Sequence, residues 1–251
     1  MTSRAFRLGL VCWYTTLLSS QGIGQERLQG DLQDILKHLG AAAESLEHSL
    51  PNMSCKENGT SEWHISHGLW HSDDFTATMR VKRTPAGRLA ESYQLTSVNG
   101  KEVSGNEKFE LPLYVTDGFD RALRYFLPSS QTCYRYTSTG NKVSFESIPS
   151  SASKAPCPDS GVSGFAVLDA EGNVNYLERR VSQPVAKQTN VAPLAKMDFR
   201  SIELDGHTYW ITKHLSSEEL LDGAILNFEV NYSDCHLFTT TVKIEPAVSV
   251  Q

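Results

Sequence analysis

The sequence lacks an apolar run long enough to span a bilayer comfortably, because the longest, from Leu8 to Leu18, falls short of the roughly 20 residues that a membrane helix needs. We therefore expect a chain that does not span a membrane. It also lacks an excess of positive charge, since 29 acidic residues outnumber 23 lysines and arginines. Phosphate binding requires clustered lysine and arginine, so nucleic acid is excluded as the main partner.

No catalytic motif, internal repeat or domain linker is present, so we expect no catalytic residue, no cofactor and no metal. Three histidines, His64, His67 and His71, are the strongest candidates for metal ligands, since zinc binds imidazoles. Their spacing suits a helix, whereas Trp63 and Ile65 indicate a strand or loop. Histidines that face solvent or cap backbone groups are the expected outcome.

The first 24 residues have the features of an export signal. Arg4 and Arg7 precede the apolar run, and Gly22 to Gly24 supplies the small residues that a signal peptidase needs. We expect cleavage near Gly24 and a single domain over residues 25–251, located in the periplasm or secreted. Removing the two arginines takes the formal net charge from −6 to −8.

Cysteines are few, and one of the five, Cys12, lies in the apolar run of the signal. The remaining four are an even number in an exported chain, which predicts two disulfides with three alternative pairings. We favour Cys133 with Cys157, which are close in sequence, and Cys55 with Cys235, which lie near the two ends of the folded region.

Apolar residues recur at three- and four-residue steps after the signal and predict an amphipathic helix from about Asp31 to His48. Asp31 favours its start and Pro51 its end. Because the polar side of this segment is acidic rather than basic, we expect its apolar stripe to pack on a sheet instead of a membrane.

Alternating apolar and polar residues predict strands over most of the remaining chain. The clearest stretches are Phe75 to Val81 and Ala224 to Tyr232. Asn99-Gly100, Gly140-Asn141 and Asp205-Gly206 have the composition of tight hairpin turns. The predicted fold is mainly β (α+β), a curved antiparallel sheet or half-barrel with the N-terminal helix and one or two short helices.

Four local features complete this prediction. Asp117 is expected to cap a short helix over residues 119–126 that Pro128 ends, and Ser216 with Glu219 has the spacing of a capping box for one helical turn. A connection at residues 233–237 is expected to lead to a further strand over residues 238–244. The change of apolar phase along residues 197–204 predicts a bulge near Arg200.

The order of these elements resembles the LolA-like lipoprotein-carrier half-barrels of the bacterial envelope, over roughly Leu32 to Ile244. The resemblance lies in the segments Gly164 to Asp169, Leu177 to Arg180 and Asp205 to Trp210. It implies a curved sheet whose concave face, closed by helices, holds an acyl chain or another apolar ligand. The chain departs from the carriers in its four mature cysteines and in a serine- and proline-rich loop at residues 149–160.

The leading hypothesis is a non-catalytic exported protein that binds a hydrophobic small molecule, a lipid or a lipoprotein. Six residues are expected to line the ligand face: Met79, Val81, Leu226, Phe228, Val230 and Tyr232. The same residues would equally form a filled core, so an alternative is a protein-interaction module that binds through a strand edge or a loop. A metal-dependent hydrolase is the least favoured class.

Overall fold

The computed structural model describes residues 31–65, 70–104, 109–115, 118–119, 122–149, 157, 161–181, 194–221 and 223–238. The predicted signal peptide over residues 1–24, His67, Asp117 and residues 239–251 lie outside the described residues.

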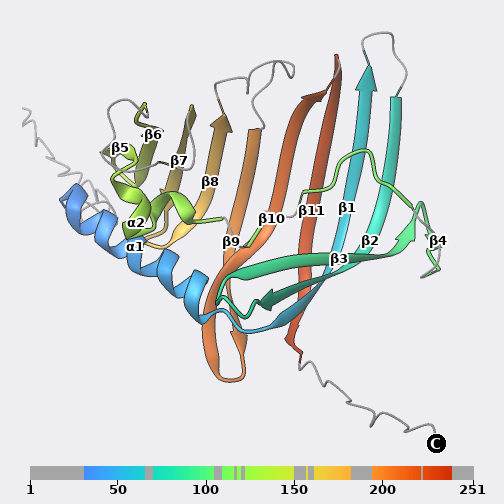
Figure 1. The fold of residues 1–251 in the computed structure, drawn as a ribbon, viewed down its shortest axis with the longest axis horizontal. Helices are drawn as coiled ribbons and strands as arrows, with labels where there is room; N and C mark the ends of the chain where they lie inside the picture. Colours follow the sequence, from blue (N-terminus) through green and yellow to red (C-terminus); the bar gives the residue numbers. More distant parts are fainter. Residues whose placement is uncertain are drawn as a thin grey trace, which may run out of the picture.

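Eleven antiparallel strands form one open sheet in the order β4-β3-β2-β1-β11-β10-β9-β8-β7-β6-β5 (Figure 1). The mainly β architecture predicted from the sequence is confirmed. The strands are β1 (Met53–Ile65), β2 (Trp70–Arg83), β3 (Leu89–Val98), β4 (Lys101–Glu102), β5 (Tyr134–Thr139), β6 (Lys142–Ser147), β7 (Val162–Leu168), β8 (Val174–Val181), β9 (Leu194–Leu204), β10 (His207–Leu221) and β11 (Ala224–Leu237).

The N-terminal helix α1 (Leu32–Ser49) forms as predicted. The side chain of Asp31 accepts a hydrogen bond from the backbone N–H of Gln33, which satisfies one of the donors that a helix start leaves without a partner. Its buried residues include Leu39, Ala43 and Leu46, on the stripe identified in the sequence. No helix within the described segments combines the length and hydrophobicity needed to cross a membrane.

Arg83, the last residue of β2, holds the C-terminal end of α1. Its guanidinium donates hydrogen bonds to the carbonyl oxygens of Glu47 and Leu50, each at 2.7 Å. The last carbonyls of a helix have no partner within the helix, and a cation at this end also complements the helix dipole. Arg83 therefore joins α1 to the sheet.

We call the sheet face that bears the apolar residues of β2 and β11 the inner face. On β2 these are Phe75, Ala77, Met79 and Val81, and on β11 they are Leu226, Phe228, Val230 and Tyr232; all are buried, as the alternation predicted. The opposite side is the outer face. Helix α1 and the short helices η2 (Arg124–Phe126) and α2 (Pro128–Gln131) lie in front of the sheet in Figure 1.

The three predicted tight turns connect neighbouring strands. Asn99-Gly100 joins β3 to β4, Gly140-Asn141 joins β5 to β6, and Asp205-Gly206 joins β9 to β10. Asn99 and Asp205 have positive φ, which asparagine and aspartate tolerate better than most residues. These turns fix the register of their hairpins, so the predicted meander is confirmed.

Two of the local predictions are wrong because a strand continues through the motif. Strand β10 runs through Ser216 and Glu219, where a helical turn was expected, because both residues pair with β9 or β11. Strand β11 runs through residues 233–237, where the sequence predicts a connection between two strands. A register shift opposite Ser54 and Lys56 and a positive φ at Asp234 accommodate its irregular sequence.

The other two local predictions need adjustment. Of the helix expected over residues 119–126, the described residues show the single turn η2, and Pro128 begins α2 instead of ending the earlier helix. Proline suits the first helical position because its φ is already helical and its missing N–H is not needed there. The β-bulge lies in β10, between Thr212 and His214, rather than near Arg200 in β9.

Two disulfides join the cysteines in the pairing that the sequence favoured. Cys55 of β1 bonds to Cys235 of β11, across a sequence separation of 180 residues. Cys133 bonds to Cys157, which lies 24 residues later. Disulfides are typical of proteins outside the reducing cytosol, so they agree with an extracytoplasmic location.

Candidate functional site

Of the three histidines considered as metal ligands, the two that the structure describes, His64 and His71, do not converge. His64 lies on β1 and His71 on β2, and the register pairs Trp63 with His71 and His64 with Trp70. Directly paired residues share a face and successive residues alternate, so the two histidines lie on opposite faces of the sheet. His64 contacts Glu62 at 3.0 Å, and His71 contacts Asp73 at 2.8 Å.

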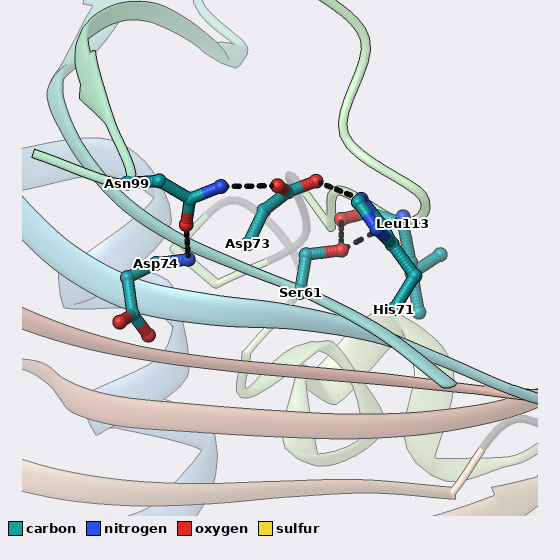
Figure 2. Close-up of polar contacts among 6 residues, drawn as sticks. All are labelled: Ser61, His71, Asp73, Asp74, Asn99 and Leu113. Atoms are coloured by element: carbon teal, nitrogen blue, oxygen red, sulfur yellow. Dashed lines mark hydrogen bonds and ion pairs between the residues drawn. The ribbon is translucent and has the colours of Figure 1, made fainter. Parts of the chain in front are cut away.

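Ser61, His71 and Asp73 lie close together on the inner face and have the composition of a hydrolase triad (Figure 2). The Ser61 hydroxyl, however, donates to the carbonyl oxygen of Leu113 at 2.9 Å and accepts from the N–H of Leu113 at 3.0 Å. A serine nucleophile needs its proton within reach of the histidine base. Ser61 is fully buried and engaged with the backbone, so this arrangement has a structural role.

Asp73 of β2 holds the turn between β3 and β4 through a hydrogen bond with Asn99. Its carboxylate accepts a hydrogen bond from the side-chain amide of Asn99 at 2.8 Å, and the amide oxygen of Asn99 accepts from the N–H of Asp74 at 2.9 Å (Figure 2). Asp73 is 2% exposed, and a buried carboxylate requires such partners.

The six residues expected to bind ligand are all found on the inner face, and each is at most 5% exposed. The described part of residues 109–127, which we call the covering segment, packs over two of them, Phe228 and Tyr232. The Phe119 ring packs edge-on against Tyr232 at 4.9 Å, and Tyr114 packs against Phe228 at 5.2 Å. The inner face is therefore occupied by the chain itself.

The described part of the covering segment is mostly irregular backbone, and polar side chains of the sheet bind it at several points, one of them the Tyr136 hydroxyl, which donates to the carbonyl oxygen of Tyr125 at 2.5 Å. Besides the Ser61 contact with Leu113, Glu57 accepts from the Tyr114 hydroxyl at 2.6 Å. Glu91 accepts from the N–H of Phe119 at 2.7 Å, and Thr212 donates to the carbonyl of Gly118. Irregular backbone leaves N–H and C=O groups without partners, and these side chains supply them.

Sequence reasoning missed these anchoring residues, although a signal was present. Glu57, Ser61, Glu91 and Thr212 are polar residues at positions whose strand phase points to the apolar face. A polar residue in an inward phase needs a buried partner. The partners are Leu113, Tyr114, Gly118 and Phe119, of which only Phe119 belongs to the apolar pattern that predicts a helix over residues 119–126, so the signal indicates a covering element without naming it.

Burial perturbs the carboxyl group of Glu57 in this arrangement. It is 1% exposed, and burial raises its pKa from 4.5 to about 7, while the hydrogen bond from Tyr114 opposes part of that rise. Burial and the neighbouring Glu57 carboxyl also raise the pKa of the Tyr114 hydroxyl, which therefore keeps its proton and donates.

We expect the Glu57→Gln variant to be less sensitive to pH than the wild type. The folded-state pKa of Glu57 lies above the unfolded value, so the stabilisation by its proton is complete below about pH 4.5 and is lost as pH rises through 7. The wild type's unfolding free energy should therefore fall by roughly 3 kcal/mol over this pH range. Urea unfolding at pH 5 and pH 8 measures it, with Glu102→Gln on the exposed strand β4 as a control that should follow the wild type.

Surface hollows among the described residues lie elsewhere. One of about 400 Å³ crosses β5 to β8 and is lined by residues that include Arg135, Glu146, Phe165 and Arg180. Another, of about 260 Å³, is lined mainly by polar residues of the outer face such as Thr60, Lys196 and Glu229. Neither has an unsatisfied polar group that would indicate a bound molecule.

No protein-family model and no curated protein matches the sequence. Solved structures are similar in fold. A LolA superfamily protein from Nitrosomonas europaea has 10% identity and a TM-score of 0.36, covering 82% of this chain and 94% of that one. A DUF1329 family protein from Desulfovibrio piger has 10% identity and a TM-score of 0.39, covering 85% and 96%.

A putative outer membrane lipoprotein-sorting protein domain from Vibrio parahaemolyticus is similar to the same degree. It has 12% identity and a TM-score of 0.38, and the match covers 85% of this chain and 96% of that domain. These three matches concern structure alone, at 10 to 12% identity and TM-scores of 0.36 to 0.39.

Proposed function

We propose that this chain is an exported, non-catalytic binding protein that holds an apolar ligand, such as a lipid or the acyl part of a lipoprotein, against the inner face of its sheet. The observation that carries this proposal is the covering segment. It occupies the apolar face with irregular backbone that a limited set of side-chain hydrogen bonds attaches to the sheet.

We infer that this element can leave the inner face while the strands of the sheet stay paired. The strands of the sheet bond to one another, whereas the covering segment contributes side chains such as Tyr114 and Phe119 that fill the place of a ligand. Exposing the inner face to water is unfavourable, so the segment stays in place until an apolar molecule replaces it. The ligand then binds to the inner face as the covering segment leaves it.

Two features support a location in the periplasm or outside the cell. Both disulfides require an oxidising compartment, and the first 24 residues have the composition of an export signal. A lipid carrier working between membranes needs such a location.

We expect the Ser61→Ala variant to bind the neutral fluorescent probe 1-N-phenylnaphthylamine about tenfold more tightly than the wild type. The variant removes two hydrogen bonds to the backbone of Leu113, a loss of about 1 to 3 kcal/mol, and so raises the fraction of molecules with a free inner face. Fluorescence titration measures the affinity, and Ser92→Ala on the exposed part of β3 is the matched control.

A wild type and a Ser61→Ala variant that stay folded but never bind the probe would contradict this function. That result would favour the alternative, an interaction module with a filled core. The burial of all six expected ligand-binding residues is the observation that supports the alternative.

A further inference from the structure

The ring of Tyr114 is enclosed by aromatic side chains from three strands. Tyr93 of β3 stacks on it with a centroid distance of 3.5 Å, Phe228 of β11 meets it edge-on at 5.2 Å, and Phe75 of β2 lies at 6.0 Å. Tyr93 is 41% exposed, so the enclosure opens to solvent at the β3 side. The covering segment thus places one side chain among the rings of three strands, which we call the aromatic cage.

A buried carboxyl closes the bottom of this cage. Glu57 lies between its neighbours on β2 and β11, and its hydrogen bond comes from the Tyr114 hydroxyl. In the described part of the chain no lysine, arginine or histidine pairs with Glu57. A buried carboxylate normally has a cationic partner, and here a neutral phenol takes that place.

Aromatic faces combined with a carboxylate are the surroundings that recognise an organic ammonium group. The ring faces attract the cation, and the carboxylate forms a stronger hydrogen bond with an ammonium than with a phenol. The apolar inner face continues from the cage along Met79 and Val230, where an alkyl chain would lie. An anionic head group would instead meet the charge of Glu57.

We propose that Phe75, Tyr93, Phe228 and Glu57 form a head-group subsite for an amphiphile that carries an ammonium group, and that Tyr114 occupies this subsite until the amphiphile displaces it. The subsite rests on the proposed function, because it is one end of the same ligand face. It goes further by naming the chemical class of the ligand and the residue that selects it.

The test compares dodecylammonium, dodecanol and dodecanoate, which share one alkyl chain, by isothermal titration below their micelle concentrations. We expect the wild type to bind dodecylammonium at least about tenfold more tightly than dodecanoate. Tyr114→Ala, which empties the cage, should strengthen dodecylammonium binding further. Tyr114→Phe keeps the ring and loses only the hydrogen bond to Glu57. It should also strengthen dodecylammonium binding, with little risk to folding.

Glu57→Gln is the decisive variant. It should reduce the preference for dodecylammonium over dodecanoate to less than about threefold, whereas Glu102→Gln, which removes an exposed charge, should leave the preference unchanged. Binding of all three amphiphiles without a preference, or a preference that survives in Glu57→Gln, would overturn the subsite and leave the proposed function standing. Binding of none of them to any variant would overturn both.

The pH dependence provides a second readout. In the described part of the chain, the titratable groups that interact with Glu57 are Tyr114 and Tyr232, and Tyr93 and Glu91 act on these two in turn; none of the four carries a positive charge. Because burial holds the pKa of Glu57 near 7, dodecylammonium binding should strengthen as pH rises from 6 to 8 and the carboxyl loses its proton. Affinity that is flat or falls over this interval would contradict the role of Glu57.

Discussion

The Cys55→Ala/Cys235→Ala double variant is expected to lose about 5 kcal/mol of unfolding free energy, the largest loss of any change considered for this protein. The bond closes a loop across a sequence separation of 180 residues, so its removal gives the unfolded chain a large gain in conformational freedom. Cys55 is 1% exposed, and alanine at this position keeps its apolar surroundings. Urea unfolding of the oxidised protein measures the loss.

Cys133→Ala/Cys157→Ala is the matched comparison. It removes a disulfide with a sequence separation of 24, for which the same relation gives a loss of about 3.5 kcal/mol. The two double variants should therefore differ by more than about 1 kcal/mol. Equal losses would show that the loop length does not govern the stabilisation.

Gly59→Ala is expected to lower the unfolding free energy by about 3 kcal/mol or more. Gly59 of β1 lies opposite Phe75 of β2, whose ring covers it on the inner face. A Cβ atom at residue 59 would overlap the backbone oxygen of Glu229 and lie 2.8 Å from Cζ of Phe75. Strand β11 cannot move away without breaking its pairing with β1, so the alanine variant would strain the sheet.

The control for this variant is Gly206→Ala. Gly206 has a φ of 73° in an open turn, and a Cβ atom there would have no neighbour within 4 Å. Its replacement should cost only about 1 kcal/mol, the ordinary penalty for a left-handed residue. Thermal and urea unfolding of both variants compare the two costs, and a smaller loss for Gly59→Ala than for Gly206→Ala would contradict the steric account.

The sequence predicts the strands of this fold well because their burial is one-sided. Along β2 and β11 every second side chain meets the inner face, so the apolar pattern records the contact directly. The N-terminal helix is equally well marked by Asp31 and by its apolar stripe. Hairpin turns such as Asn99-Gly100 are predictable because few residues tolerate their backbone angles.

Long strands that pass through turn-like motifs are less predictable. Ser216 and Glu219 have the spacing of a helix start, but pairing with β9 and β11 outweighs that local preference. In β11 the residues after Tyr232 resemble a loop, yet they stay extended because β1 and the bond to Cys235 hold them. Both errors arise where tertiary contacts decide the conformation.

The candidate site was only half predictable for a related reason. Phe228 and Val230 could be assigned to the ligand face from their alternation alone. The covering segment could not be assigned, because its contacts are made by individual side chains such as Tyr114 and Phe119 rather than by a repeating pattern. Glu57 and Ser61 are polar residues in the strand phase of the inner face, and they are the sequence features that indicate a covering element.

The place of β1 in the sheet also determines the order in which the protein can be assembled. β1 pairs with β2 on one side and with β11 on the other, so the earliest strand depends on the latest one (Figure 1). Until synthesis reaches β11, the strands from β1 to β4 and those from β5 to β10 are two separate ribbons. Joining them requires contacts far apart in the sequence, so we expect this step to be slow, and a chain truncated before Ala224 would leave both ribbons exposed to other chains.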